Sequence, residues 1–179
     1  ASGYLALMAI FSFPSVMMKQ TALLLNLFVA GIAFYQYFKT GHFNKHLFLY
    51  FALGSIPAAF IGGLLSLDPS VYNKFLGVIL FFTIARMLFK KETSDLKTKK
   101  IPVLLALLIG VIIGFFSGLI GIGGGIILTP VILLFHWGKM KEAAAVSALF
   151  IWVNSASGFL GQLVSGININ TNSFILVSL

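Results

Sequence analysis

Residues 101–137 read IPVLLALLIGVIIGFFSGLIGIGGGIILTPVILLFHW, and this stretch decides the fold class. It carries no Asp, Glu, Lys or Arg. A helix that spans a bilayer needs about 20 predominantly apolar residues, and the stretch exceeds that length. Three consecutive glycines, Gly123 to Gly125, interrupt it. The sequence therefore predicts a membrane-embedded segment that is broken at glycines.

The composition of the whole chain supports this interpretation. The chain has 179 residues, of which 59% are hydrophobic and 9% are charged, and its mean hydropathy is +1.05. About a quarter of the residues of a soluble domain are charged, so these values exclude a soluble enzyme, a nucleic-acid-binding domain and a disordered tail. The net charge of +8 fits the excess of Lys and Arg in cytoplasmic loops, so no nucleic-acid partner is expected.

Further apolar runs, separated by short polar stretches, predict a polytopic all-α protein. None alternates like a strand, and an open sheet cannot cross lipid with unpaired edges. The expected segments are Leu5–Phe13 as the end of a first span, Thr21–Phe38, Leu47–Leu67, Val71–Phe89, Ile101–Trp137, Glu142–Leu163, and a last span that starts at Ser173. Because both ends of the chain lie within apolar stretches, we expect a fragment truncated at both ends inside transmembrane segments.

Basic residues predict the orientation. Loop 90–100 carries five lysines, and loop 39–46 carries two lysines and two histidines. Two spans separate these loops, so both should lie on one side, and the bias of Lys and Arg places that side in the cytoplasm. The turn Asp68–Ser70, Lys19, and the pair Lys139 and Lys141 are then expected on the outer side.

An internal repeat is predicted at an offset of 122 residues. This shift places the sequence MMKQTA of residues 17–22 over KMKEAA of residues 139–144, and the pair Leu27-Phe28 over Leu149-Phe150. Repeats of this kind are typical of secondary transporters. We expect two parallel four-span repeats: 1–91 as the first, 92–100 as a basic cytoplasmic loop, and 101–179 as the second.

The glycine break is the strongest candidate for a functional site. Three glycines in a span weaken the helix, and the freed backbone groups need partners away from lipid. A helix that resumes after the break would direct free N–H groups and its positive dipole end into a buried cavity, which suits an anion. Ser117 and Thr129 are possible hydroxyl donors there. The alternative is close helix packing, which is the expected role of Gly110 and Gly114.

Polar residues within other spans are the remaining candidates. The stretch 142–163 carries Ser147 and Asn154, and Asn154 shares a helical face with Gly158 and Gly161. Such residues either contact a substrate or form interhelical hydrogen bonds. No acidic residue lies within a span, so a carboxylate proton relay is not expected. The chain lacks cysteine, and its histidines do not have the spacing of metal ligands, so neither a metal nor a cofactor is expected.

Two enzymatic interpretations fail on missing residues. The motif GIGGG at 121–125 lacks the Lys-Ser/Thr of a nucleotide-binding loop. The motif SASG at 155–158 is similar to the nucleophile motif of rhomboid intramembrane proteases, but no histidine base lies deep in a span. The chain is therefore not expected to be an enzyme.

The segment from Gly114 to Gly125 (GFFSGLIGIGGG), then Pro130, then AAVSAL at 144–149, resembles the sulfite exporter TauE/SafE family. The specific match covers about 50 residues, and the span layout extends it over the chain. The resemblance implies an eight-span inner-membrane carrier that often exports sulfite, organosulfonates or related small organic anions. The glycine motif of the first repeat, expected upstream of Leu5, is absent from this sequence.

The sequence thus predicts a multi-pass secondary transporter, an exporter of small anions, in a bacterial cytoplasmic membrane. Its expected partners are the anion and the lipid bilayer. A membrane scaffold or assembly protein, in which the glycines serve packing only, is the alternative. The expected substrate-binding residues are Ser117, Gly121, Gly123, Gly124, Gly125, Thr129, Pro130, Ser147, Asn154 and Asn26, and no catalytic residue is expected.

Overall fold

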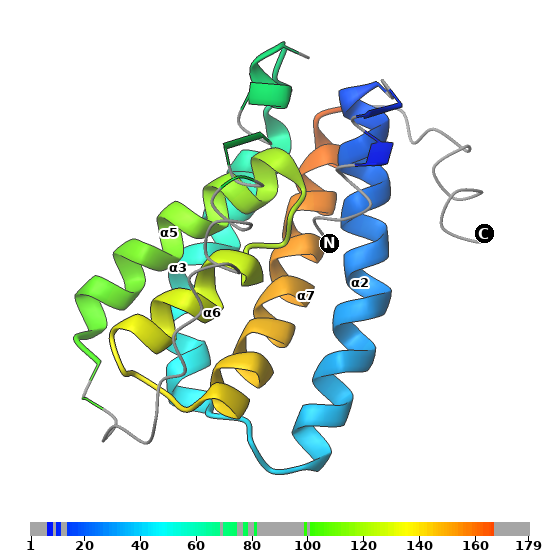
Figure 1. Cartoon of the computed structure of the whole chain (residues 1–179). Coiled ribbons are helices and arrows are strands. Elements are labelled where there is room, and N and C mark those ends of the chain that lie inside the picture. The colour runs from blue at the N-terminus through cyan, green and yellow to red at the C-terminus, as the bar shows by residue number, and fades with distance from the viewer. Residues whose placement is uncertain are drawn as a thin grey trace.

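The computed structural model describes residues 7–8, 10–11, 14–68, 70–74, 77–78, 81, 99 and 101–166. Its named elements are α2 (Ser15–Lys39), α3 (Lys45–Leu64), α5 (Val103–Ile120), α6 (Gly125–Leu134) and α7 (Met140–Val164), shown in Figure 1. The described residues include helices and no strand, which confirms the all-α fold class. Helices α2, α3, α5 and α7 are long and apolar enough to cross a membrane, so the chain is a multi-pass membrane protein.

Several predicted features lie outside the described residues. They are most of the segment Leu5–Phe13, most of Val71–Phe89, loop 90–100 apart from Lys99, the last span from Ser173, and the proposed domain boundary at 92–100.

Helices α5 and α6 form a re-entrant hairpin. Helix α6 has 10 residues. At 1.5 Å per residue this is about 15 Å, or half of the roughly 30 Å hydrocarbon core. The backbone N–H of Lys99, just before α5, donates to the carbonyl of His136, just after α6, at 2.8 Å. The chain therefore enters α5 and leaves α6 at the same end of the bundle, with the glycine break at 121–124 between them.

This hairpin corrects the predicted position of Lys139 and Lys141. Trp137 packs on Phe51 of α3 with ring centroids 6.0 Å apart, and a Cβ on Gly138 would lie 3.3 Å from the side chain of Leu47. These lysines therefore lie at the start of α3, on the same side as loop 39–46. The prediction that Lys139 and Lys141 lie on the opposite side is wrong. Residues 101–137 do not cross the membrane once but turn back at the glycine break.

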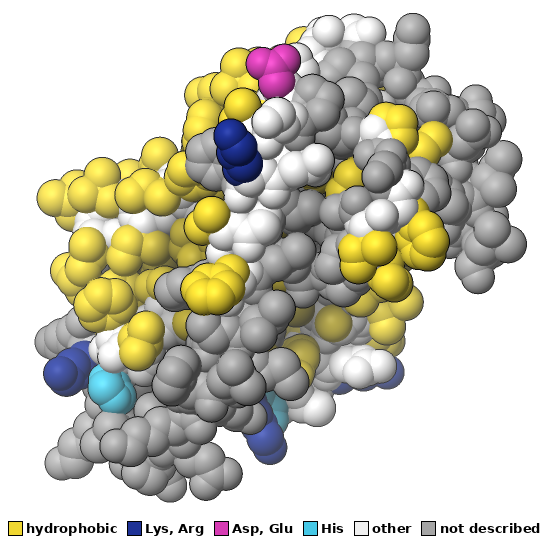
Figure 2. Space-filling view, turned by 45° about the horizontal axis from the view of Figure 1, so that its top comes forward, with side chains coloured by type: hydrophobic (Ala, Val, Ile, Leu, Met, Phe, Trp, Pro, Cys, Tyr) yellow, Lys and Arg dark blue, Asp and Glu magenta, His cyan; other side chains and the backbone are white. Residues whose placement is uncertain are grey.

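Exposed basic side chains consequently gather at one end of the molecule. Figure 2 shows Lys and His side chains along this end, and one acidic and one basic side chain at the other. The exposed lysines at the first end are Lys39, Lys45, Lys99, Lys139 and Lys141, and the exposed charged residues at the second are Asp68 and Lys74. We call the first the lysine-rich end.

Small residues bring α3 and α5 together. A Cβ on Gly110, Gly114 or Gly118 of α5 would fall on the backbone carbonyl of Phe51, Ser55 or Ala59 of α3, respectively. The four-residue spacing on both helices shows that they run in the same direction and touch along a glycine stripe. The predicted packing role of Gly110 and Gly114 is confirmed. The opposite face of α5 exposes large apolar side chains, as expected toward lipid: Leu104, Leu108 and Ile112.

The predicted parallel repeat is not confirmed. It pairs the start of α2 with the start of α7, and helices related by an axis along the membrane normal must run the same way. Instead, Gly31 of α2 lies beside Trp152 of α7, and Leu23 lies beside Gly158. Since the numbers rise on one helix as they fall on the other, α2 and α7 are antiparallel, as Figure 1 shows.

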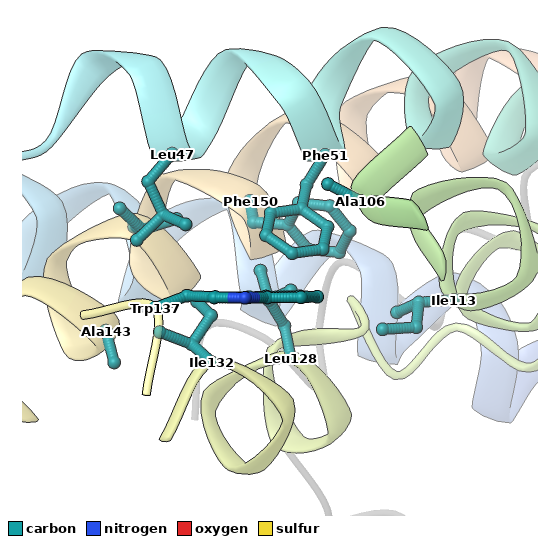
Figure 3. Close-up of a cluster of buried hydrophobic side chains, with 10 residues drawn as sticks. Leu47, Phe51, Ala106, Ile113, Leu128, Ile132, Trp137, Ala143 and Phe150 are labelled. Atoms are coloured by element: carbon teal, nitrogen blue, oxygen red, sulfur yellow. The ribbon is translucent and has the colours of Figure 1, made fainter. Parts of the chain in front are cut away.

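Two apolar clusters enclose the hairpin tip. The larger joins α3, α5, α6 and α7 toward the lysine-rich end, and Figure 3 shows Trp137 beneath Phe51 and Phe150. The smaller cluster contains Met18, Ala22, Tyr72, Leu119, Ile120 and Ile122. Residues 121–125 are buried: Ile113 and Phe150 of the larger cluster border Gly124, and Ile122 belongs to the smaller cluster.

Candidate functional site

The glycine break is a turn that requires glycine at specific positions. Gly121, Gly123 and Gly124 have φ values of 87°, 79° and 73°, a left-handed region that only glycine enters without strain. Gly121 ends α5, and Gly124 precedes the first residue of α6. The helix resumes at Gly125, so the predicted interruption at these glycines is confirmed.

Protein donors occupy three carbonyl groups at the end of α5, where the turn begins. The N–H of Gly121 donates to the carbonyl of Ser117 at 2.8 Å. The hydroxyl of Tyr72 donates to the carbonyl of Ile120 at 2.9 Å, and Asn26 Nδ2 of α2 donates to the carbonyl of Gly121 at 3.1 Å. Side chains from two other segments thus hold the C-terminal end of α5, and these three carbonyls already have donors.

The N–H groups on the other side of the turn are less well satisfied. The N-terminus of α6 has no side-chain cap, and its N-cap residue is Gly124, which has no side chain to offer. The first N–H groups of a helix have no acceptor within it, and the helix dipole adds positive potential at this end. The turn therefore presents hydrogen-bond donors toward its surroundings.

Two serine hydroxyls beside the turn have no hydrogen-bond partner among the described residues: Ser117 Oγ of α5 and Ser155 Oγ of α7. Their residues are only 2% and 0% exposed. A Cβ on Gly123 would lie 3.1 Å from Ser155 Oγ and 3.0 Å from Asn26 Nδ2, and a Cβ on Gly124 would lie 3.3 Å from Ser117 Cβ. Buried hydroxyls are almost always paired, so two beside one uncapped helix start indicate a place for a ligand.

The same glycines are also tightly packed. A Cβ on Gly124 would come within 2.8 Å of Ile113 and 2.9 Å of Phe150, and a Cβ on Gly123 within 2.7 Å of Ile151. Close packing and a buried polar site thus coexist at this turn, so the two interpretations of the glycines do not exclude each other.

The predicted site residues divide into two groups. Ser117, Gly121, Gly123, Gly124 and Asn26 meet at the turn, and Gly125 opens α6.

The second group contains Thr129, Pro130, Ser147 and Asn154, which lie within α6 and α7. Thr129 Oγ1 donates to the Gly125 carbonyl at 3.0 Å and bonds Ser147 Oγ at 2.7 Å, which ties α6 to α7. Pro130 is buried within α6. Asn154 Nδ2 donates to the Phe150 carbonyl of its own helix at 2.8 Å, and its Oδ1 has no partner.

On α7 the sequence selected Ser147 and Asn154 and missed Ser155. The face of Asn154, Gly158 and Gly161 packs on α3 and α5: a Cβ on Gly158 would lie 3.2 Å from the Cα of Gly118. The turn contacts Ser147, Ile151 and Ser155 instead. Their four-residue spacing places them on one face and was the signal that could have identified Ser155.

Lys19, which the sequence predicts on the outer side, is a buried residue near the start of α2. It is 5% exposed, and its Nζ donates to the carbonyls of Gly62, Gly63 and Leu65 at 3.3, 3.2 and 3.0 Å. The ammonium therefore caps the C-terminal end of α3, where a positive charge is favourable. Its backbone also borders the turn, since a Cβ on Gly121 would lie 3.1 Å from the Lys19 carbonyl oxygen.

The family described as Sulfite exporter TauE/SafE matches residues 3–179. The "Probable membrane transporter protein y4hK" of Sinorhizobium fredii is 39% identical over 169 residues, which cover 92% of this chain and 68% of that protein. The "Probable membrane transporter protein YunE" of Bacillus subtilis is 24% identical over 82% of this chain and 61% of its own length. A probable membrane transporter protein of Methanocaldococcus jannaschii is 33% identical over 61% of this chain and 39% of its own length. No solved structure matches the chain.

Proposed function

Because this chain belongs to the sulfite exporter TauE/SafE family, whose relatives are named membrane transporters, we propose that it is a secondary transporter of small anions. The proposed cargo is sulfite, an organosulfonate or another small organic anion, moved outward across a bacterial cytoplasmic membrane. The glycine turn between α5 and α6 is the proposed binding site. The proposal assigns no covalent chemistry to the protein.

One observation carries this proposal: the groups left without partners at the turn suit an anion. The carbonyls of Ser117, Ile120 and Gly121, at the end of α5, already accept from Gly121, Tyr72 and Asn26, which makes them weaker ligands for a cation. The first turn of α6 and the hydroxyls of Ser117 and Ser155 remain to donate. Backbone N–H groups at a helix start are a common anion site.

The surrounding charges favour the same ligand. Of the described acidic residues, Asp68 is exposed, and Glu142 accepts from the backbone N–H of Lys139 at 2.9 Å. Neither lies at the turn. The ammonium of Lys19, two helical turns from Asn26 on α2, adds a buried positive charge with no carboxylate partner among the described residues. Unscreened positive potential in a low-dielectric interior attracts anions strongly.

The position of the turn suits alternating access. The larger apolar cluster borders Gly124 through Ile113 and Phe150, and Ile122 of the turn belongs to the smaller cluster. We propose that the lysine-rich end faces the cytoplasm, as the bias of basic residues predicts. The cluster around Trp137 and Phe150 would then separate the site from the cytoplasm, and the cluster around Tyr72 would separate it from the outside.

The rival function is a membrane scaffold in which the glycines serve packing alone. Packing explains Gly110, Gly114 and Gly118, but it does not explain buried hydroxyls without partners at Ser117 and Ser155. A serine protease is disfavoured by the positions of the described histidines. His42 and His46 flank the start of α3, and His136 follows α6, all at the lysine-rich end.

Uptake into inside-out vesicles that contain the intact protein tests the proposal. Radiolabelled sulfite should accumulate, and Ser117→Ala should weaken its affinity by about 0.5–1.5 kcal/mol, or up to about 3 kcal/mol if the hydroxyl meets the charged group. Protein amounts in the vesicles should remain at the wild-type level. Absence of transport of sulfite, sulfate and organosulfonates by correctly inserted protein would favour the scaffold.

A further inference from the structure

Ser155 Oγ is one of three buried hydroxyls on the described helices that have no hydrogen-bond partner, together with Ser117 Oγ and Thr21 Oγ1. Serine and threonine in a helix usually bond to a nearby backbone carbonyl. Buried Ser55 does so by donating to Ala52, and partly buried Thr129 does so by donating to Gly125. Ser155 Oγ makes no such bond, although it is 0% exposed.

Its neighbour Ser157 provides an internal comparison. Both serines lie on α7 and are buried, but Ser157 Oγ donates to the carbonyl of Ile56 in α3 at 2.7 Å. Ser157 therefore connects two helices, whereas the hydroxyl of Ser155 faces Gly123 at the turn. A structural role explains the first hydroxyl, and nothing within the described protein explains the second.

Ser117 provides the matching hydroxyl from the other side of the turn. It belongs to α5 and borders Gly124, while Ser155 belongs to α7 and borders Gly123. The N-terminus of α6 starts between these contacts without a side-chain cap. Donors from three elements therefore surround two consecutive glycines, and all of them suit a ligand that accepts hydrogen bonds.

We propose that Ser155 is a substrate-binding residue that, together with Ser117, clamps the transported anion against the first turn of α6. This inference rests on the proposed transport function, and it gives α5 and α7 one anion-binding hydroxyl each. An anion with several oxygen atoms accepts from both hydroxyls and from the backbone at once. Because α5 and α7 each supply one donor, a shift of either helix weakens the site, which links release of the anion to helix movement.

The test compares Ser155→Ala with Ser157→Ala in the intact protein, using sulfite uptake into proteoliposomes and thermal unfolding in detergent. Ser155→Ala should raise the KM for sulfite by about 10- to 100-fold, the effect of losing one hydrogen bond to a charged group. Its melting temperature should stay the same or rise, because no protein partner is lost. Ser157→Ala should lower the melting temperature and leave the KM unchanged.

Three results would overturn the inference. A KM for sulfite in Ser155→Ala equal to that of the wild type would show that the Ser155 hydroxyl does not bind the anion. The proposed function would still stand in that case, because the wild-type protein transports sulfite. A fall in melting temperature equal to that of Ser157→Ala would make the role of Ser155 structural. Absence of anion transport by the wild-type protein would remove the proposed function, and this inference with it. The Ser117→Ala, Ser155→Ala double variant tests whether the two hydroxyls share a ligand. A fold-change in its KM that differs from the product of the two single fold-changes would support a shared ligand.

Discussion

Single glycines fix the shape of the turn, and Gly124 illustrates the requirement. It combines a φ of 73° with a position where a Cβ would approach Ile113 and Phe150 within 3 Å. Gly41, in the loop between α2 and α3, has a φ of 72° and open space around it. A comparison of alanine variants at these two glycines therefore distinguishes the cost of backbone strain, present at both, from the cost of steric crowding, present at Gly124.

We expect Gly124→Ala to be much more destabilising than Gly41→Ala. Both variants force alanine into the left-handed region, at about 1–2 kcal/mol. Only Gly124→Ala adds overpacking, typically about 1–3 kcal/mol. Thermal unfolding of purified protein in detergent measures both, and equal losses of stability would show that packing at Gly124 is looser than described.

Lys19 is a second residue whose role depends on its partners. Lys19→Met keeps much of the apolar stem but leaves the three carbonyls at the end of α3 without their donor. A buried acceptor without a partner costs about 1–3 kcal/mol, so the variant should unfold at a lower temperature. Lys19→Arg should retain more of the stability. Lys74→Met, at an exposed position, is the control and should have little effect. If Lys19→Met unfolds at the wild-type temperature, the Lys19 ammonium does not stabilise the end of α3.

At the scale of elements, close contact between α3 and α5 depends on the absence of side chains. A Cβ on Gly118 would overlap the Ala59 carbonyl, so Gly118→Ala must move the helices apart and should lower stability. Gly77→Ala is the matched control, because a Cβ there meets nothing within 4 Å, and alanine favours a helix by about 1 kcal/mol. Denaturation in mixed micelles should show a lower free energy of unfolding for Gly118→Ala and a higher one for Gly77→Ala, each relative to the wild type. A neutral Gly118→Ala would contradict the direct backbone contact.

At the scale of the whole molecule, the re-entrant hairpin determines which loops share a side. The chain has no cysteine, so single cysteines can be labelled without background. Thr40→Cys and Lys141→Cys should react alike with an impermeant thiol reagent, only after permeabilisation of cells if the lysine-rich end is cytoplasmic. Asp68→Cys should react in intact cells. Labelling of Lys141→Cys together with Asp68→Cys in intact cells would mean that residues 101–137 cross the membrane fully. A complete inversion of the labelling pattern would reverse the orientation of the protein but leave the re-entrant hairpin in place.

The sequence by itself determined the membrane class, the helical fold, the spans that form α2, α3 and α7, and the break at Gly123 to Gly125. These features depend on local hydropathy and on the conformational freedom of glycine, which the order of residues encodes directly. The family membership was also visible in the residues around this break.

Only the tertiary structure decided how the segments are arranged. Hydropathy does not distinguish a full crossing from a helix, a turn and a short returning helix, because both are apolar along their length. The place of Lys139 and Lys141, the antiparallel course of α2 and α7, and the capping role of Lys19 all follow from that distinction. The same limit applied to the site: the side of α7 that meets the turn depends on helix rotation, so Ser155, rather than Asn154, faces Gly123. Rotation is set by packing between glycine stripes far apart in the sequence, and no local pattern contains it.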